Sequence, residues 1–369
     1  MDPRAGAGAQ APHGRGGSTA GAGGVLAGSD GEGVHGPLRR GPRGEGPVKP
    51  SVSVLLPAYN AGPFVEGTVR SVQGQTFAGW EIVACDDCSS DETVVRLEAL
   101  SRADDRIRVF RNDRNRGVTG NWNECLRRAT GTLVMKIDAD DAFRPRTLEE
   151  LVEALEDPAV VGAGVRTLTC GEDLEPIGGF PADDAMRGAG IDPFSDHVKP
   201  CADWYAVASH GHQLWAGDGV MLRRERLEEM GGLDERFGCA SDTDLIARVL
   251  EGPGKFAHRR YVGVLYRTVE SSVSHESRRN NWLYWEGTVT SLVSLARYRR
   301  ENEVPRGLRM RYADLWRRWH GPGASDRRGR ELPGEMLEKL EDVMREVPPP
   351  PLKDRLLRRA RVAISRVPV

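Results

Sequence analysis

Aspartates gather at the ends of two short apolar segments in the first half of the chain. One pair follows the apolar run 81–85, and three more follow the run 133–137. These residues are Asp86, Asp87, Asp138, Asp140 and Asp141. Because ligands of open α/β sheets bind beyond the carboxyl ends of the strands, the pattern predicts a polar site at one edge of a sheet. The alternative is that each aspartate only caps the helix or turn that follows it.

The segments around these aspartates alternate between strand-like and helix-like patterns. Apolar runs typical of buried strands are 52–56, 81–85, 107–111, 133–137 and 157–168. Helical patterns separate them, near 63–75, from Ser90, near 119–129 and near 146–156. This alternation predicts an α/β fold with a mostly parallel, doubly wound sheet. Residues 170–212 show little periodicity and predict a long functional loop, whereas 242–250 and 281–301 predict helices.

The two ends differ from the middle in composition. The first 47 residues contain 15 of the 44 glycines and no aromatic residue, so they bury too little apolar surface to fold and are expected to be disordered. The predicted division is a Gly-rich tail over 1–49, an α/β domain over 50–270, a helical extension over 271–347, and a Pro-rich break with a basic helix over 348–369.

Charge, cysteines and hydropathy restrict the class of protein. A formal net charge of −2 gives no electrostatic case for binding nucleic acid. Cys85 and Cys88 form a C-x-x-C, but no second pair completes a zinc site, and six scattered cysteines are typical of a reducing cytoplasm. The sequence contains no secretory signal and no apolar window long enough for a transmembrane helix. We therefore expect a cytoplasmic protein.

Six motifs in order resemble the conserved blocks of family 2 glycosyltransferases. The motifs are the strand ending Pro57-Ala58-Tyr59-Asn60, the block Asp86-Asp87-Cys88-Ser89-Ser90-Asp91, Asn115-Arg116-Gly117 with Asn123, Ile137-Asp138-Ala139-Asp140-Asp141, Gly231-Gly232-Leu233-Asp234-Glu235 and Ser241-Asp242-Thr243-Asp244-Leu245. Three positions depart from the family: Cys88 stands for Gly, Leu233 for Phe and Ser241 for Glu. The resemblance covers roughly 50–270.

The resemblance implies a GT-A fold, with a nucleotide-binding half followed by an acceptor half. It also implies transfer of a sugar, with inversion, from a nucleotide sugar such as a UDP-sugar to a hydroxyl acceptor in the synthesis of cell-surface polysaccharide or glycan. A glycan or a lipid-linked glycan is then the expected acceptor. The alternative, from another functional class, is a catalytically inactive protein that binds nucleotide sugars on the same fold.

The chemistry of such a transfer assigns roles to the carboxylates. A general base must take the proton of the acceptor hydroxyl, and Asp242 is predicted to be this base; alternatively Asp242 caps a helix and Asp244 is the base. A metal ion stabilises the departing diphosphate, so Mn²⁺ or Mg²⁺ is expected at Asp138 and Asp140. Along an extended segment these two side chains point to one side and Asp141 to the other.

The remaining predicted contacts concern the nucleotide and the acceptor. Tyr59 offers an aromatic face to a uracil ring, and Asp87 accepts a hydrogen bond from its N–H; alternatively Tyr59 only packs against a helix. The predicted donor-binding residues are Pro57, Tyr59, Asn60, Asp87, Asn123 and Asp138. Trp215 and Asp218 are candidates for acceptor binding, with a core Trp as the alternative. His275 is either near the diphosphate or in a solvated loop.

The segment 352–367 has the clearest helical pattern of the chain. Its aliphatic face consists of Leu352, Leu356, Ala360, Ala363, Ile364 and Val367, and its opposite face carries Arg355, Arg358, Arg359, Arg361 and Arg366. Such a helix lies in a membrane interface or docks its aliphatic face on the catalytic domain. The first alternative predicts a peripheral contact with the inner face of the plasma membrane.

Overall fold

The computed structural model describes residues 51–179, 181–209, 214–269, 282–301, 306–321 and 334–351, together with residues 323 and 332. Three sequence-based predictions lie outside these residues: the Gly-rich tail, His275 and the basic segment 352–367.

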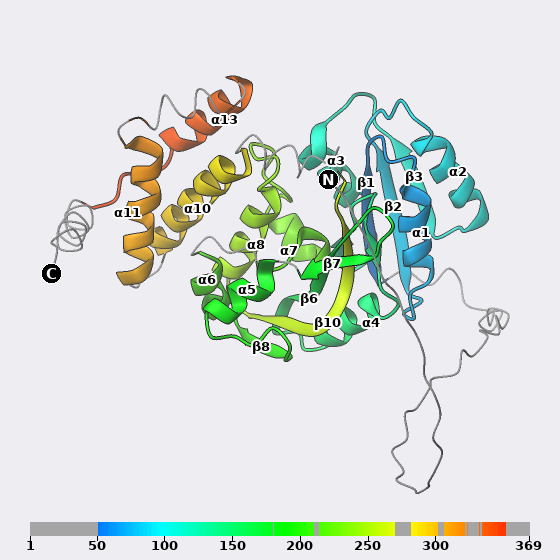
Figure 1. Cartoon of the computed structure of the whole chain (residues 1–369), viewed down its shortest axis with the longest axis horizontal. Helices are drawn as coiled ribbons and strands as arrows, with labels where there is room; N and C mark the ends of the chain where they lie inside the picture. Colours follow the sequence, from blue (N-terminus) through cyan, green and yellow to red (C-terminus); the bar gives the residue numbers. More distant parts are fainter. Residues whose placement is uncertain are drawn as a thin grey trace, which may run out of the picture. The chain divides into compact units, whose positions relative to one another are not determined.

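A single sheet of ten strands forms the centre of the described chain (Figure 1). Its strand order is β3-β2-β1-β4-β9-β6-β10-β5, with β7 beside β6 and β8 beside β10. The strands are β1 (Val52–Ala58), β2 (Trp80–Asp86), β3 (Ile107–Arg111), β4 (Leu133–Lys136), β5 (Ala142–Phe143), β6 (Val160–Cys170), β7 (Pro176–Gly179), β8 (His197–Pro200), β9 (Val220–Arg223) and β10 (Lys255–Arg267).

The first four strands in the sheet order run parallel. β1 lies between β2 and β4, and β2 continues to β3, with parallel pairing throughout. β9 then runs antiparallel to both β4 and β6, whereas β6 and β10 are parallel. The predicted α/β fold with a largely parallel central sheet is confirmed, and the carboxyl ends of β1, β2 and β4 lie at one edge.

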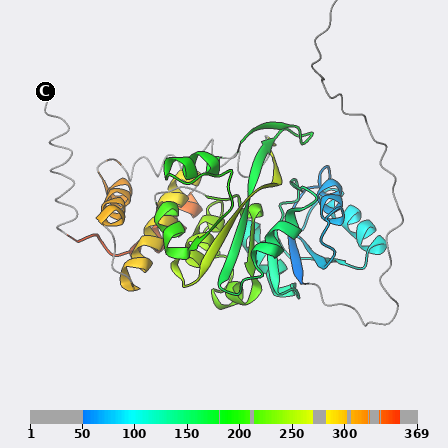
Figure 2. The same ribbon diagram turned by 90° about the horizontal axis from the view of Figure 1, so that it is seen from below.

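Helices cover both faces of this sheet (Figures 1 and 2). They are α1 (Val65–Gln73), α2 (Thr93–Ala103), α3 (Gly117–Arg128), α4 (Thr147–Ala154), α5 (Pro181–Gly188), α6 (Cys201–Ala208), the 3₁₀ turn η1 (Gly217–Gly219), α7 (Arg224–Glu229), α8 (Ser241–Glu251), α10 (Trp282–Glu301), α11 (Arg306–His320) and α13 (Gly334–Arg345).

The alternation of side chains along β1 separates two cores. Val54 and Leu56 point to one face, where they share a core with α1, α2 and α4. Leu55 points to the other face and belongs to a core that contains residues of α3, α8 and α10. Both faces of β1 are buried because helices pack on each side, which is why its sequence is an apolar run and not an alternating one.

The segment predicted as one long loop contains regular structure. Residues 170–209 include β7, α5, β8 and α6, each of four or eight residues. Elements this short present too few residues for a helical or strand period to be recognised in the sequence. They extend the sheet and cover its second half, so this part of the chain belongs to the scaffold.

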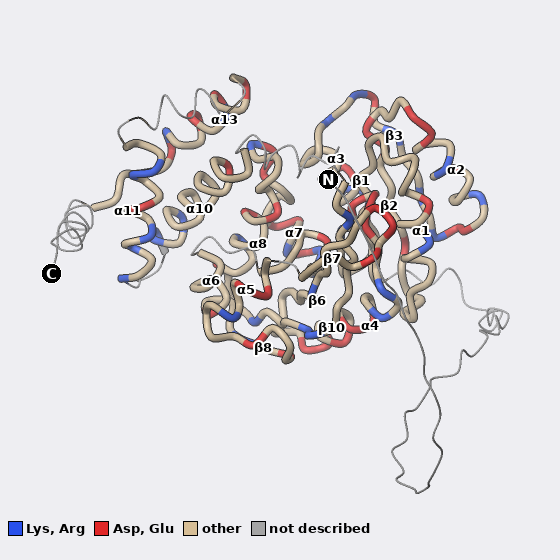
Figure 3. Tube along the Cα trace, in the orientation of Figure 1, with Lys and Arg blue, Asp and Glu red and all other residues tan. Residues whose placement is uncertain are grey.

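The predicted helical extension is present and packs against the side of the sheet that carries α3 and α8. Trp285 of α10 and Trp319 of α11 meet edge to face, with ring centroids 5.8 Å apart, in the core shared with α3 and α8. Helix α11 carries five arginines and one aspartate (Figure 3). None of the described helices is long and apolar enough to cross a membrane.

Candidate active site

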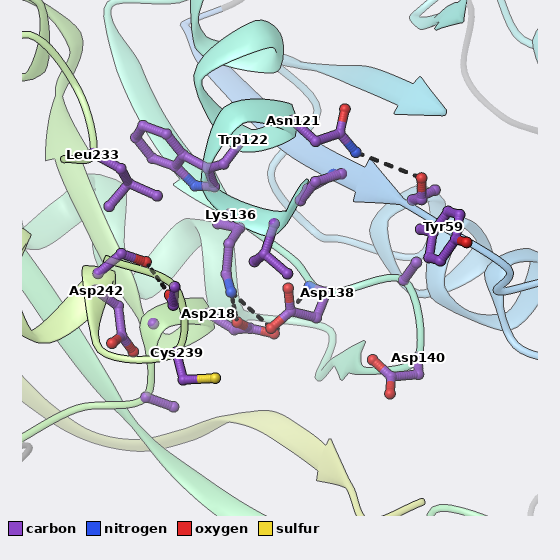
Figure 4. A pocket seen from close by; sticks show the side chains of 18 of the residues that line it. Tyr59, Asn121, Trp122, Lys136, Asp138, Asp140, Asp218, Leu233, Cys239 and Asp242 are labelled. Atoms are coloured by element: carbon purple, nitrogen blue, oxygen red, sulfur yellow. Dashed lines mark hydrogen bonds and ion pairs between the residues drawn. The ribbon is translucent and has the colours of Figure 1, made fainter. Parts of the chain in front are cut away.

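A cavity of about 650 Å³ opens at the carboxyl ends of β1 and β4. The turn η1 and the first turn of α8 form its opposite wall (Figure 4). Eight predicted site residues line it: Pro57, Tyr59, Asn60, Asp87, Asp138, Asp140, Asp218 and the predicted base Asp242. Two predicted site residues, Asn123 and Trp215, do not line it. The sequence therefore located the edge of the sheet at which a site forms.

Tyr59 and Asn60 form the turn after β1. The side chain of Tyr59 is 54% exposed at the cavity, so one face of its ring is available for stacking. Asn60 has a φ of 48°, and its side-chain oxygen accepts a hydrogen bond from Ser90 N at 2.9 Å. Asn60 thus ties the turn after β1 to the turn after β2, in addition to lining the cavity.

Asp87 is buried after β2 and holds the start of α3. Its carboxylate accepts hydrogen bonds from Arg116 N (2.8 Å), Gly117 N (2.9 Å) and the Asn112 side chain (2.7 Å). These contacts satisfy backbone donors at a helix N-terminus. Asp87 therefore both lines the cavity and fixes the position of α3, and its substitution affects both properties. Nearby Cys88 has a φ of 63°, at the position where the family usually has Gly.

Asn123, a predicted donor-binding residue, does not line the cavity, whereas Asn121 on the same helix does. The side chain of Asn123 donates to Leu233 O (3.0 Å) and accepts from Leu233 N (2.9 Å), so it joins α3 to the loop between α7 and α8. Asn121 lines the cavity instead. Two residues that are two positions apart in an α-helix lie about 200° apart around its axis, since a turn holds 3.6 residues. The helical phase of α3, counted from Gly117, is the sequence signal that identifies Asn121.

Three carboxylates form a group at the floor of the cavity. Oxygens of Asp138, Asp141 and Asp218 lie within 4.8 Å of one another. The chain does not stay extended after β4 but turns, because Asp141 N donates to Asp138 O at 3.1 Å. The predicted alternation, with Asp141 facing away from Asp138, is therefore wrong. Asp218 joins from η1, where its carboxylate accepts from Asp138 N at 3.0 Å.

The chemistry of this group fits a divalent cation. Oδ2 of Asp141 is buried and receives no hydrogen bond from any donor in the described ranges. Burial, together with neighbouring Asp218, raises the pKa of Asp141 well above its usual value, and the same two causes raise the pKa of Asp138 to about 8. Crowded carboxylates require either protons or a cation between them, and three carboxylates provide the hard oxygen ligands that Mg²⁺ and Mn²⁺ prefer.

Asp140, one of the two predicted metal ligands, lines the cavity but is not a member of the three-carboxylate group. Its backbone oxygen accepts from Arg267 Nε at 2.6 Å, which orients the turn. Burial and the nearby Asp218 carboxylate raise the pKa of its side chain. Figure 4 shows the Asp140 side chain apart from the Asp138 and Asp218 carboxylates.

Lys136 is a residue of this site that the sequence analysis missed. It is the last residue of β4, and its Nζ lies 2.6 Å from Asp138 Oδ2 and 3.0 Å from Asp218 Oδ1. Burial alone lowers the pKa of a lysine, but Asp138 and Asp218 outweigh burial and raise the pKa of Lys136 well above its usual value. Its signal in the sequence is a single cation in an apolar strand, directly before the aspartates.

Asp242 lies in the first turn of α8, across the cavity from β4. One of its oxygens accepts from Thr243 N at 2.7 Å. Burial raises the pKa of the Asp242 carboxyl, and the charge of Lys136 partly offsets this rise. A Cβ at Gly217 would lie 3.1 Å from Asp242 Oδ2, so glycine permits the close approach of η1 to Asp242.

The alternative base, Asp244, points away from the cavity. Its carboxylate lies 2.7 Å from Arg248 Nε and 3.5 Å from Arg297 of α10, and it does not line the cavity. Asp242 and Asp244 face opposite sides of α8 because they are two residues apart. Asp244 thus belongs to a buried ionic network that joins α8 to the helical extension.

Glu286 of α10 supports the loop that leads to Asp242. Its carboxylate accepts from Gly238 N at 3.2 Å and from Ala240 N at 2.9 Å, and it is 2% exposed. This contact spans more than forty residues of sequence, so no local pattern indicates it. The helical extension therefore fixes the position of one wall of the cavity.

Trp215 is a core residue. It is 2% exposed, its Nε1 donates to His258 Nδ1 at 3.1 Å, and its ring lies 4.5 Å from that of Phe256. A Cβ at Gly164 would lie 2.4 Å from the indole, so this glycine provides the space that the ring fills. The arrangement corresponds to the alternative in which Trp215 packs in the core, whereas Asp218 does line the cavity.

Comparison with known proteins agrees with this architecture. Residues 53–179 match the model of Glycosyl transferase family 2. The chain is 38% identical over 98 residues, 27% of this chain and 38% of the other, to the UDP-Glc:alpha-D-GlcNAc-diphosphoundecaprenol beta-1,3-glucosyltransferase WfgD of Escherichia coli. The chain spans less than half the length of the first curated relatives that it matches.

Solved structures show the same fold at low sequence identity. TarS 1-349 of S. aureus in complex with UDP-GlcNAc aligns with a TM-score of 0.56 and 17% identity, over 81% of this chain and 82% of that one. The mannosyltransferase PcManGT of Pyrobaculum calidifontis, in complex with GDP-Man and Mn²⁺, aligns with a TM-score of 0.50 and 18% identity, over 86% and 81%. Residues 53–179 therefore match glycosyl transferase family 2, the described chain has the GT-A fold of these structures, and the resemblance stated from the motifs is confirmed.

Proposed function

We propose that the protein is an inverting glycosyltransferase that moves a sugar from a UDP-sugar to a hydroxyl acceptor with the help of a divalent cation. The observation that supports this proposal is the set of side chains that line one cavity. It holds an exposed aromatic ring at Tyr59, a group of buried carboxylates around Asp138, and a separate carboxylate at Asp242 on the opposite wall. These are the three parts that binding of a nucleotide, departure of a diphosphate and activation of an acceptor require.

In this proposal each wall of the cavity has one task. Tyr59 and Asp87 bind the nucleotide base, with Pro57 and Asn60 shaping the turn between them. Asp138, Asp141 and Asp218 hold the divalent cation, with Asp140 beside them, and the ion supplies charge stabilisation for the diphosphate. Asp242 accepts the proton of the acceptor hydroxyl as the oxygen attacks the anomeric carbon. The elements that carry these groups are packed in two shared cores.

A panel of nucleotide sugars, including UDP- and GDP-sugars, tests the proposal. The purified protein is incubated with each donor and Mn²⁺, and the released nucleoside diphosphate is measured. We expect release from at least one UDP-sugar, increased by the correct acceptor. Binding of UDP-sugars without any release, across a panel of lipid-linked and soluble glycan acceptors, would instead support the alternative of an inactive binding protein.

The exposed ring of Tyr59 leads to a prediction for nucleotide binding. We expect Tyr59→Ala to weaken UDP binding by about 1 kcal/mol, because stacking on the base is lost. Isothermal titration calorimetry with UDP measures the change. Tyr59→Phe keeps the ring and is the matched control, for which we expect wild-type affinity. Equal UDP affinity in Tyr59→Ala and wild type would show that the base binds elsewhere.

We propose a lipid-linked glycan as the acceptor and a site of action at the inner face of the plasma membrane. The name of WfgD specifies an undecaprenol diphosphate acceptor, and the segment 352–367, outside the described residues, has the pattern of an interfacial helix. Helix α11, in the C-terminal part of the described chain, carries five further arginines.

This membrane proposal has its own test. We expect the full-length protein to co-sediment with anionic vesicles at low salt and to be released at high salt, because screening weakens the attraction of the arginines. A variant that ends at Val347 is expected to stay in the supernatant and to keep its affinity for UDP. Equal vesicle binding by both proteins would exclude the segment as the anchor, and misfolding of the shortened variant would favour docking on the catalytic domain.

A further inference from the structure

The ammonium group of Lys136 contacts two of the carboxylates that fit a metal ion. Its side chain is 17% exposed, and its ammonium lies 2.6 Å from Asp138 Oδ2 and 3.0 Å from Asp218 Oδ1 (Figure 4). Both carboxylates belong to the group that, with Asp141, gathers oxygens within 4.8 Å. A divalent cation bound to this group shares two of its carboxylates with Lys136, and it repels the ammonium.

The single positive charge of Lys136 does not neutralise all the carboxylates of the cavity. Besides Asp87, five carboxylates of the described residues lie in or under the cavity wall: Asp138, Asp140, Asp141, Asp218 and Asp242. Lys136 contacts two of them, and Asp141 Oδ2 stays without a described donor. The ammonium thus neutralises part of the group, and capacity for a further cation remains.

Lys136 is also placed to contact a diphosphate. An ammonium has three N–H donors on a flexible four-carbon stem, and two of them suffice for Asp138 and Asp218. A Cβ at Gly217, on the opposite wall, would lie 3.5 Å from Nζ, so the ammonium lies between β4 and η1 and lines the cavity. An anionic ligand that enters beside the carboxylates meets this cation.

We propose that Lys136 is an internal counter-ion that neutralises Asp138 and Asp218 in the nucleotide-free protein and turns to the donor diphosphate when the nucleotide enters, so that the divalent cation and the nucleotide bind as a coupled pair. This inference rests on the proposed function, since it assigns the cavity to a diphosphate and a metal ion. Lys136 thereby contacts the donor, and it links the binding of the cation to the binding of the nucleotide.

Binding of Mn²⁺ alone tests the first half of the proposal. Free Mn²⁺ is measured by electron paramagnetic resonance during titration of wild type, Lys136→Met, Lys136→Arg and Lys255→Met. Lys255 lies on the surface and pairs with Asp157 at 3.4 Å, so Lys255→Met is a control with the same change in net charge. We expect Lys136→Met to bind Mn²⁺ at least tenfold more tightly than wild type, and both Lys136→Arg and Lys255→Met to resemble wild type.

The same titrations with saturating UDP test the coupling. We expect UDP to tighten Mn²⁺ binding at least tenfold in wild type and, by reciprocity, Mn²⁺ to tighten UDP binding equally; in Lys136→Met this factor is smaller, because only the direct attraction between the ion and the diphosphate remains. Wild type that binds Mn²⁺ equally well with and without UDP overturns the proposal without any variant. Unchanged Mn²⁺ affinity in a folded Lys136→Met also overturns it, and Lys136→Gln replaces this variant if Lys136→Met does not fold.

The titrations without and with UDP distinguish a failure of this proposal from a failure of the proposed function. Absence of UDP binding in wild type, together with tighter Mn²⁺ binding by Lys136→Met, refutes the assignment of the cavity to a UDP-sugar but confirms the counter-ion role. Normal UDP binding and sugar transfer, together with no effect of Lys136→Met on Mn²⁺ affinity, confirms the enzyme and refutes the role of Lys136.

Discussion

Asp242→Asn is expected to lose a factor of about 10²–10⁴ in kcat, because the substitution keeps the shape of the side chain and removes its basicity. Its affinity for UDP, measured by calorimetry, is expected to change little, since the nucleotide contacts lie on the β1 side of the cavity. The rate of the wild type should fall as the pH falls through the pKa of Asp242, because only the ionised carboxylate accepts the proton. Burial raises this pKa, so the decline begins at a higher pH than for an exposed aspartate.

Asp244→Asn is the matched control, two residues along the same helix. Asp244 pairs with Arg248 and Arg297 away from the cavity, and loss of a buried ion pair costs about 3–5 kcal/mol. We therefore expect a lower free energy of unfolding and a kcat close to that of wild type. The opposite result, with Asp242→Asn near wild type and Asp244→Asn inactive, would move the base to the side of α8 that faces α10.

The sequence predicted the parallel half of the fold well because its signals are local. Each of β1, β2 and β4 is an apolar run that ends in a polar motif, and strands of this kind favour parallel pairing when helices alternate with them. The residues at those ends, such as Tyr59 and Asp87, do line the cavity. The short elements β7, α5, β8 and α6 carry no such signal, since their burial is decided by the sheet that they join.

The differences between the sequence-based predictions and the structure at the site also have physical reasons. The sequence predicts that Asn123 contacts the donor, whereas the phase of α3 brings Asn121 to the cavity, and Asp141 would face the far side only if the chain stayed extended where it turns. Lys136 carries no local signal, since a single polar residue in a strand gives no pattern. Glu286 holds the loop before Asp242 from a helix far along the chain, and only the packed structure reveals such a contact.

Removal of the divalent cation is expected to abolish transfer. An excess of chelator should lower the rate by on the order of 10³-fold or more, because the ion supplies several kcal/mol of charge stabilisation and each 1.36 kcal/mol is a factor of ten. Added Mn²⁺ or Mg²⁺ should restore it. Full activity in excess chelator would show that the cationic side chains of the site, Lys136 first among them, stabilise the diphosphate without an ion.

Single substitutions then decide which aspartates hold the ion. Asp218→Asn is expected to weaken Mn²⁺ binding and to lower kcat, because Asp218 belongs to the three-carboxylate group at the cavity floor. Asp140→Asn tests the ligand predicted from the motif, and Asp234→Asn, whose side chain pairs with Arg236 outside the cavity, is the control. A loss of Mn²⁺ affinity in Asp140→Asn alone would place the ion on the cavity wall, above the buried group. A loss in Asp218→Asn alone would place it on the floor, where Lys136 contacts two of the same carboxylates.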